Sequence, residues 1–238
     1  GAMRLIVTRP EEDALATARV LEALGHTPIL APLLDIVPLP DAQVPAGDFR
    51  AVLVTSANGA RALAALPRIG RLRGAMAVAV GPASAQAARD AGFRNVATAE
   101  GDLASLIRWV RGHVPPGAGP LLYPSGAVTA GDVVGEPGTL GYEVRRAVLY
   151  EARPVATLPA AAASALRDGT ADGATLYSPR TASIWARLAN AAGLAERAAS
   201  LMHYCLSANV ASAVRSGLGG HCPVAVAETP DEPALLRL

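Results

Sequence analysis

The sequence contains no lysine, and all 21 of its cationic side chains are arginines. This absence excludes a P-loop lysine, a Schiff-base lysine of the kind used with pyridoxal phosphate or in aldolases, and a Ser-Lys dyad. Arginine binds carboxylates and phosphates well because its guanidinium is a planar fork. A GC-rich genome would also favour arginine over lysine, so the composition by itself assigns no ligand.

Charge is also scarce: 17% of the residues are charged and the formal net charge is +1. Nothing resembles a polybasic surface for nucleic acid or membrane, so neither is expected as a partner. The longest uncharged stretches, residues 112–131 and 198–214, contain polar residues or prolines and lack the roughly 18 to 20 apolar residues of a membrane span. Because no secretory leader precedes Met3, we expect a soluble cytoplasmic protein.

Cysteine and histidine are too few and too scattered for most metal or redox sites. Cys205 and Cys222 form neither a C-x-x-C motif nor a disulfide framework, and they are interpreted as buried thiols in a reducing cytosol. The four histidines match no zinc motif: His26, His113, His203 and His221. We therefore expect no metal site.

What the chain does have is an internal repeat. A length of 238 residues with 51% hydrophobic content allows one large core or two of about 110 to 120 residues each, and the repeat favours two. Three segments recur in the same order at offsets of 122, 126 and 128: residues 54–58 with 176–180, 80–85 with 206–211, and 96–100 with 224–228. Each places small polar residues where a strand gives way to a helix. Open α/β sheets bind ligands at such strand ends.

Short apolar strands alternate with helices along the whole chain, which predicts α/β architecture with parallel, doubly wound sheets. Strands are predicted at 5–8, 27–31, 50–55, 75–80, 95–97, 121–125 and 144–150, and again near 176, 206 and 224. Helices are predicted at 10–24, 57–66, 83–91 and 101–111, with another between Ser125 and Leu140. Prolines break the pattern at 37–40. The repeat predicts two lobes and a ligand cleft, but it leaves open whether the lobes are sequential.

The polar turns supply the candidate ligand-binding residues. Carboxylates at helix N-termini gain about 0.3 to 1 kcal/mol each, and small residues let backbone N–H groups approach a ligand. The small candidates are Ser56, Gly81, Ser84, Ser178 and Ser207. The three serines 56, 84 and 178 could instead simply cap helices, stabilising by about 1 kcal/mol each. Asn58 and Arg180 occupy equivalent turns and are the better ligand candidates.

The chain resembles the uroporphyrinogen-III synthase family. The segments that carry the resemblance span nearly the entire chain: residues 7–10, 55–59, 79–84, 141–150, 177–180 and 226–230. The resemblance implies two flavodoxin-like domains that exchange segments, one made of 1–36 plus 154–238 and the other of 38–152. Two adjacent crossings, marked by Pro38 and Pro154, would form a two-segment hinge beside an interdomain cleft.

The resemblance also implies the activity. The linear tetrapyrrole hydroxymethylbilane, which carries eight carboxylates, would be dehydrated and closed to uroporphyrinogen III with inversion of ring D. No cofactor is implied. The product feeds haem, chlorophyll and cobalamin biosynthesis. We expect a monomer that receives its substrate by transient handover from hydroxymethylbilane synthase.

Particular residues match the family's pattern. Tyr150 matches the tyrosine proposed to help water leave, although a structural tyrosine at a strand end beside the crossing is the alternative. Thr8 and Arg9 follow the first strand and would lie at the rim of the cleft. The alternative for Arg9 is a solvated ion pair with Glu12 or Asp13.

One turn departs from the pattern. Where the family commonly has Gly-Pro-Thr-Thr, this chain has Ser207 to Val210. Asn209 could replace a hydroxyl donor, but Val210 could not. This puts the equivalent ligand contact in doubt.

Two other function classes are compatible with two α/β lobes. A two-lobed cytosolic module could bind a small molecule without transforming it, and a glycosyltransferase could use two Rossmann-like lobes but would normally be longer and carry an acidic metal motif. A hydrolase is disfavoured because no G-x-S-x-G elbow is present.

Overall fold

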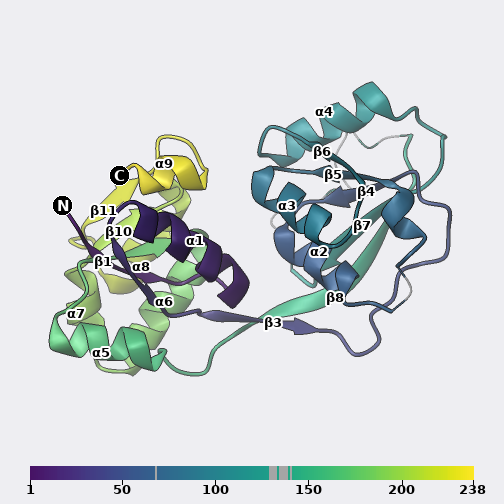
Figure 1. Cartoon of the computed structure of the whole chain (residues 1–238). Coiled ribbons are helices and arrows are strands. Elements are labelled where there is room, and N and C mark those ends of the chain that lie inside the picture. The colour runs from purple at the N-terminus through teal and green to yellow at the C-terminus, as the bar shows by residue number, and fades with distance from the viewer. Residues whose placement is uncertain (68, 129–132, 134–138, 140) are drawn as a thin grey trace. The chain divides into compact units, whose positions relative to one another are not determined.

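The computed structural model describes residues 1–67, 69–128, 133, 139 and 141–238. The chain forms two compact units. Unit 1 combines Gly1–Asp35 with Arg153–Leu238, and unit 2 is Ile36–Ala152. Unit 1 is therefore discontinuous in sequence, which Figure 1 shows by the purple N-terminal and green to yellow C-terminal colours within one unit.

Unit 1 is built on a five-stranded sheet in the order β11-β10-β9-β1-β2, and every neighbouring pair is parallel. Its strands are β1 (Arg4–Val7), β2 (Thr27–Leu30), β9 (Gly173–Leu176), β10 (Met202–Cys205) and β11 (Val224–Val226). Counted along the chain within the unit, this order is 2-1-3-4-5, the flavodoxin-like doubly wound topology. The predicted fold class is confirmed for this unit.

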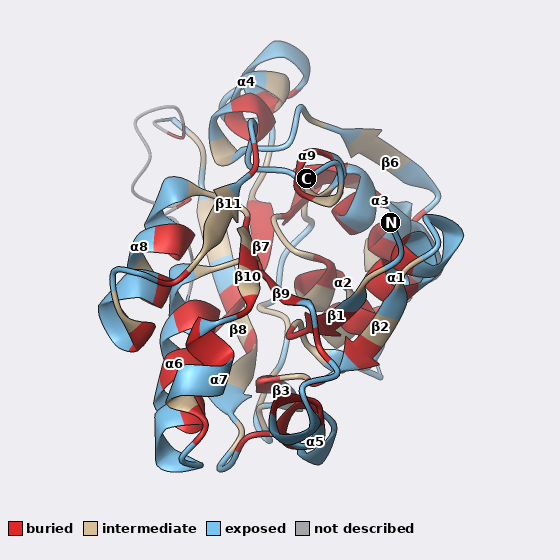
Figure 2. Cartoon of the chain, turned by 90° about the vertical axis from the view of Figure 1, so that its left-hand side faces the viewer, coloured by how far each residue is buried: buried red, intermediate tan, exposed pale blue. Residues whose placement is uncertain are grey.

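Helices cover both faces of the unit 1 sheet, because successive residues of a strand point to opposite faces. The face that carries Leu5 and Val7 packs against α1 (Glu11–Ala23) and α9 (Glu232–Leu236). The other face packs against α6 (Pro179–Ala191) and α8 (Ala208–Leu218), with α5 (Ala160–Asp168) and α7 (Ala195–Ala199) beside them. In Figure 2 these helices show both buried and exposed residues, as amphipathic helices do.

Unit 2 has a six-stranded sheet in the order β3-β8-β7-β4-β5-β6. Its strands are β3 (Leu34–Pro38), β4 (Ala51–Val54), β5 (Met76–Ala79), β6 (Asn95–Thr98), β7 (Leu121–Gly126) and β8 (Val144–Pro154). From β8 to β6 the pairs are parallel. If β7 is counted as the first strand and β8 as the second, these five strands follow the same 2-1-3-4-5 order. The two units therefore share one topology but differ in which strand comes first in the sequence.

The helices of unit 2 also lie on two faces. Val52 and Val54 of β4 share a core with α2 (Ala57–Ala64) and α3 (Pro82–Asp90). Leu53 points the other way, into a core with α4 (Leu103–His113). A short 3-10 helix, η1 (Leu72–Gly74), precedes β5. The helix predicted between Ser125 and Leu140 falls largely outside the described residues.

The predicted break at residues 37–40 is wrong in one respect, because β3 is an edge strand that extends to Pro38. Leu39 N–H donates to Leu149 O at 3.0 Å and Val155 N–H donates to Leu33 O at 3.0 Å, so β3 runs antiparallel to β8. Proline is tolerated there because it ends an edge strand. The chain passes from one unit to the other within these two paired strands.

Candidate functional site

Ser56 and Tyr150 meet at the carboxyl end of the unit 2 sheet. Ser56 is the N-cap of α2, with an extended backbone, and its Oγ accepts a hydrogen bond from Gly59 N–H at 3.2 Å. The Ser56 Oγ also lies 3.2 Å from the Tyr150 hydroxyl, and either atom could be the donor. The structure therefore brings a predicted binding residue and the predicted catalytic residue into direct contact.

A β-bulge in β8 and a glycine opposite it in β7 give the Tyr150 ring its place. The register between β7 and β8 shifts at Ser125 and Gly126, and Gly126 then lies opposite Tyr150. A Cβ at Gly126 would lie 2.8 Å from Cε2 of Tyr150. Arg146 fixes the bulge by donating to Ser125 Oγ at 2.7 Å and to Gly126 O at 2.8 Å. Gly126 and Arg146 were not predicted from the sequence, because a bulge has no marker in the hydrophobic pattern.

The other predicted unit 2 residues lie in the first turns of α2 and α3. Asn58 Oδ1 accepts from Arg61 Nη1 at 3.0 Å within α2. Gly81 is the N-cap of α3 and has no side chain to cap it, and Pro82 begins the helix. Ser84 is buried inside that first turn and is not the N-cap, so the capping interpretation is wrong for Ser84.

In unit 1, two predicted serines are helix caps. Ser178 Oγ accepts from Thr181 N–H at 3.1 Å at the start of α6. Ser207 Oγ accepts from Val210 N–H at 3.4 Å at the start of α8. Arg180 and Asn209 are exposed in the first turns of these two helices. Val210 is buried and has an apolar side chain, so it offers no second hydroxyl in this turn.

Thr8 lies in the core of unit 1. The residue is 1% exposed, and its Oγ1 donates to Thr175 O at 2.9 Å, which joins the end of β1 to β9. Its carbonyl accepts from Leu33 N–H at 3.1 Å, so both the hydroxyl and the backbone carbonyl of Thr8 are engaged within unit 1.

Arg9 is half-buried, and its ion-pair partner is Glu232 of α9, with 3.2 Å between Nη1 and Oε2. The sequence-based alternative, a solvated pair with Glu12 or Asp13, is wrong about the partner. Arg9 and Glu232 lie 223 positions apart in the sequence. They meet only in the folded protein, because α1 and α9 cover the same face of the sheet.

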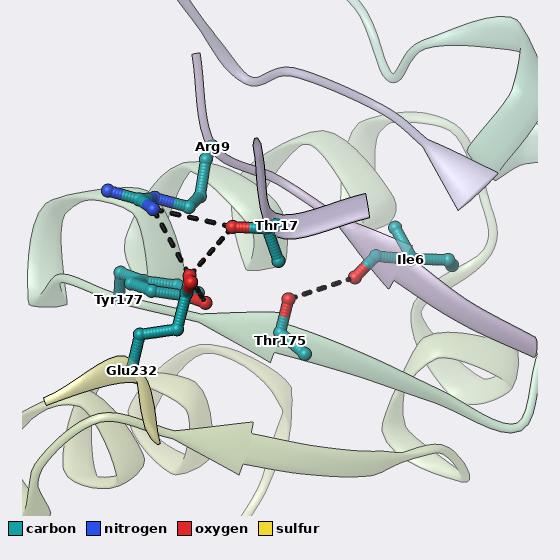
Figure 3. Close-up of polar contacts among 6 residues, drawn as sticks. All are labelled: Ile6, Arg9, Thr17, Thr175, Tyr177 and Glu232. Atoms are coloured by element: carbon teal, nitrogen blue, oxygen red, sulfur yellow. Dashed lines mark hydrogen bonds and ion pairs between the residues drawn. The ribbon is translucent and has the colours of Figure 1, made fainter. Parts of the chain in front are cut away.

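Three donors converge on the same carboxylate oxygen of Glu232 (Figure 3). Thr17 Oγ1 donates to Oε2 at 2.7 Å, Arg9 Nη1 donates at 3.2 Å, and the Tyr177 hydroxyl donates in a short hydrogen bond. The guanidinium carbon of Arg9 lies 4.3 Å from the centre of the Tyr177 ring, a cation–π distance. We call these four residues the Arg9 cluster.

Electrostatics keep Tyr177 protonated in the Arg9 cluster. Burial and the adjacent Glu232 charge raise the pKa of Tyr177 well above its usual range. The tyrosine is therefore a permanent donor to the carboxylate near neutral pH. Thr17, Tyr177 and Glu232 were not predicted from the sequence, since no local motif links residues so far apart in the chain.

A cavity of about 920 Å³ lies in unit 2, away from the polar turns. Its lining includes Arg50 and Met76 at the amino ends of β4 and β5, and Trp109 of α4. Ser56 and Gly81 follow the carboxyl ends of the same strands, so cavity and turns lie at opposite edges of the sheet. The cavity lining includes none of the predicted site residues.

Cys205 and Cys222 are free and buried, which confirms the prediction that they are buried thiols.

In the part of the chain that the structure describes, no group of histidine, cysteine or acidic residues could hold a metal ion. None of the described helices combines the length and apolar character that crossing a membrane requires.

Comparison with known proteins gives a family and solved structures of similar fold. The family model described as uroporphyrinogen-III synthase HemD matches residues 15–237. A crystal structure of a mutant uroporphyrinogen III synthase from the extremely thermophilic bacterium Thermus thermophilus is 21% identical, with 99% of this chain and 96% of that chain covered and a TM-score of 0.51. The uroporphyrinogen-III synthetase of Helicobacter pylori is 17% identical, with coverage of 99% and 97% and a TM-score of 0.56. No curated protein sequence matches.

Proposed function

Because the chain belongs to the uroporphyrinogen-III synthase family, which closes hydroxymethylbilane to uroporphyrinogen III with inversion of ring D and loss of water, we propose that its polar turns bind that substrate and that Tyr150 assists the chemistry. The observation that carries the function is the family match over residues 15–237. The contact between Tyr150 and Ser56 supports the assignment of the residues.

The substrate's carboxylates suit the turns. The N-termini of α2, α3, α6 and α8 all follow carboxyl ends of parallel strands, and each favours an anion by about 0.3 to 1 kcal/mol. The proposed substrate-binding residues are Thr8, Arg9, Ser56, Asn58, Gly81, Ser84, Ser178, Arg180, Ser207 and Asn209. Thr8, Gly81 and Ser84 are the buried members of this set.

The chemistry calls for one proton donor and a fixed geometry. Tyr150 would protonate the departing hydroxyl of hydroxymethylbilane, so that water leaves and an electrophilic azafulvene forms. The terminal pyrrole then attacks through its substituted carbon to give a spiro intermediate. The original bond between that carbon and its bridging methylene breaks, the methylene rejoins the ring at the unsubstituted carbon, and the proton lost from that carbon restores the tyrosine. Holding this geometry is the larger task, because the unassisted substrate closes without inversion.

Ser56 is placed to orient the donor. Its Oγ accepts from Gly59 N–H, which leaves the serine's own proton for Tyr150. In that arrangement the phenolic proton of Tyr150 is directed toward another acceptor, as a general acid requires.

Replacement of Tyr150 tests this role. Tyr150→Phe is expected to lower kcat by about 10²-fold, the lower end of the range for general acid catalysis. The expected loss is at the lower end because the substrate can form the azafulvene slowly without a proton donor. Thermal unfolding should change little, since the ring is retained. Tyr142→Phe is the matched control: it removes a unit 2 hydroxyl that donates to Val114 O instead. An unchanged kcat in Tyr150→Phe would remove the tyrosine from the mechanism.

Three finer proposals accompany this function. The protein acts as a monomer in the cytoplasm. Its product serves haem, chlorophyll or cobalamin synthesis. Transient handover from hydroxymethylbilane synthase would shield a substrate that otherwise closes to the uninverted isomer.

A further inference from the structure

The hydrogen bonds of the Arg9 cluster have a defined direction. Arg9 Nη1 donates to Thr17 Oγ1 at 3.3 Å and to Glu232 Oε2 at 3.2 Å, and Thr17 donates its own proton to the same Oε2 at 2.7 Å. Tyr177 completes the set from the carboxyl end of β9, with its ring against the guanidinium. Arg9 is thus held on one edge by the triangle and on one face by an aromatic ring.

The opposite edge of the guanidinium is not used by the protein. All of Arg9's side-chain hydrogen bonds to the described residues run through Nη1, so Nε and Nη2 donate to none of these residues. The Arg9 side chain is 26% exposed, and Figure 3 shows a terminal nitrogen turned away from Thr17 and Glu232. Nε and Nη2 together form the fork that binds a carboxylate through two parallel hydrogen bonds.

We propose that Glu232, Thr17 and Tyr177 are positioning residues that hold Arg9 so that its Nε and Nη2 take one carboxylate of hydroxymethylbilane in a bidentate pair. This inference rests on the proposed function. It assigns Glu232 a role although its charge has the same sign as the substrate's carboxylates.

The physical reason is preorganisation. A solvent-exposed arginine loses rotamer freedom when it binds an anion, and that entropy cost weakens binding. Glu232 and the Tyr177 ring fix the guanidinium before the substrate arrives, so the cost is met during folding. Because Tyr177 stays protonated, its hydroxyl continues to hold Glu232 near neutral pH.

Glu232→Gln distinguishes this positioning role from two others: competition with the substrate for Arg9, and simple anchoring of α9. The substitution preserves shape but replaces the charged carboxylate by a neutral amide, so the ion pair with Arg9 is lost and the hydrogen bonds that converge on Oε2 are weakened. We expect KM for hydroxymethylbilane to rise by about tenfold, the scale of one weakened charge-assisted hydrogen bond, with kcat nearly unchanged. Glu143→Gln is the matched control, since it breaks an Arg–Glu pair of 2.7 Å at the amino end of β8.

Two further variants test the fork itself. Arg9→Lys keeps the charge but lacks the planar fork, so its KM should rise nearly as much as that of Arg9→Ala. The double variant Arg9→Ala/Glu232→Gln should show no larger KM than Arg9→Ala alone, because Glu232 acts only through Arg9.

Each contrary outcome overturns the proposal. A lower KM in Glu232→Gln would mean that the carboxylate competes with the substrate for Arg9. An unchanged KM with a lower melting temperature would mean that Glu232 only anchors α9. All rates are read as uroporphyrinogen III formed, so a wild-type protein that yields none would refute the proposed function itself, whereas a wild-type rate with these contrary KM values would refute only the positioning role.

Discussion

At the scale of single residues, His203 of β10 is a fully buried imidazole with both ring nitrogens engaged. Trp185 Nε1 donates to His203 Nε2 at 3.0 Å, and because an indole can only donate, that nitrogen must be the acceptor. We therefore assign the proton of the neutral ring to Nδ1, which faces the Cys222 sulfur at 3.1 Å. Burial lowers the pKa of His203 to about 4.

The His203 pKa makes stability fall in acid. An unfolded imidazole binds a proton below about pH 6.5, whereas the folded one binds it only below about pH 4, so lowering the pH between these values favours the unfolded state. The contribution is fully present above pH 6.5 and is lost by about pH 4, a total of about 3 kcal/mol.

Urea unfolding of the wild type and His203→Gln between about pH 7.5 and 4 measures this effect. The variant should be less stable at the upper end of this range but should lose less free energy of unfolding on acidification, because glutamine does not titrate. Parallel curves for the two proteins would show that His203 does not carry the acid sensitivity.

The residue scale also shows what a sequence can predict about polar side chains. Ser56 and Ser178 follow apolar strands directly and are the caps that their position predicts. Ser84 follows Pro82, which can begin a helix, so the helix starts earlier and the serine is enclosed in it. The partners of Arg9 could not be predicted, because Glu232 and Tyr177 reach it only through the folded sheet.

At the scale of elements, the bulge of β8 determines where the Tyr150 ring can lie. Gly126 is the residue whose missing side chain leaves space for that ring, and Arg146 holds the irregular segment by donating to the Ser125 hydroxyl and to the Gly126 carbonyl. Bulges often re-aim a side chain beside an active site. The position of the Tyr150 ring thus depends on a backbone irregularity.

Gly126→Ala tests the bulge. The added methyl group would come within 2.8 Å of the Tyr150 ring, so we expect the ring to move and its hydrogen bond with Ser56 to be lost. Turnover should fall toward that of Tyr150→Phe. Gly112→Ala, in α4 with open space around the new Cβ, is the matched control. Wild-type kcat in Gly126→Ala would show that the ring need not occupy this position.

The positions of helices and strands were largely predictable, because apolar residues recur with different periods in the two. The helices α2, α3 and α4 begin and end within two residues of the predicted helices. The edge strand β3 was hidden by Pro38 and Pro40. The strand β8 also extends to Pro154, beyond the predicted end at Tyr150. Both errors concern strands whose prolines suggested a break, although the strands pair with each other.

At the scale of the whole molecule, the repeat in the sequence becomes two sheets with the same strand order. Each unit draws its 2-1-3-4-5 sheet from a pair of strands and a separate run of three strands, which comes later in the chain in unit 1 and earlier in unit 2. In unit 1, β1 pairs with β9, so Val7 lies beside Thr175. Composition and periodicity could not predict this pairing, because either half of a repeat can complete the sheet of the other. The family resemblance supplied that choice.

The most direct test of the central claim is the isomer composition of the product. Wild-type protein is supplied with hydroxymethylbilane generated enzymatically in the same vessel, and the uroporphyrin isomers are then separated by chromatography after oxidation. We predict predominantly isomer III, in an amount that rises with the concentration of this protein. Isomer I alone, at the level formed without the protein, would contradict the assignment.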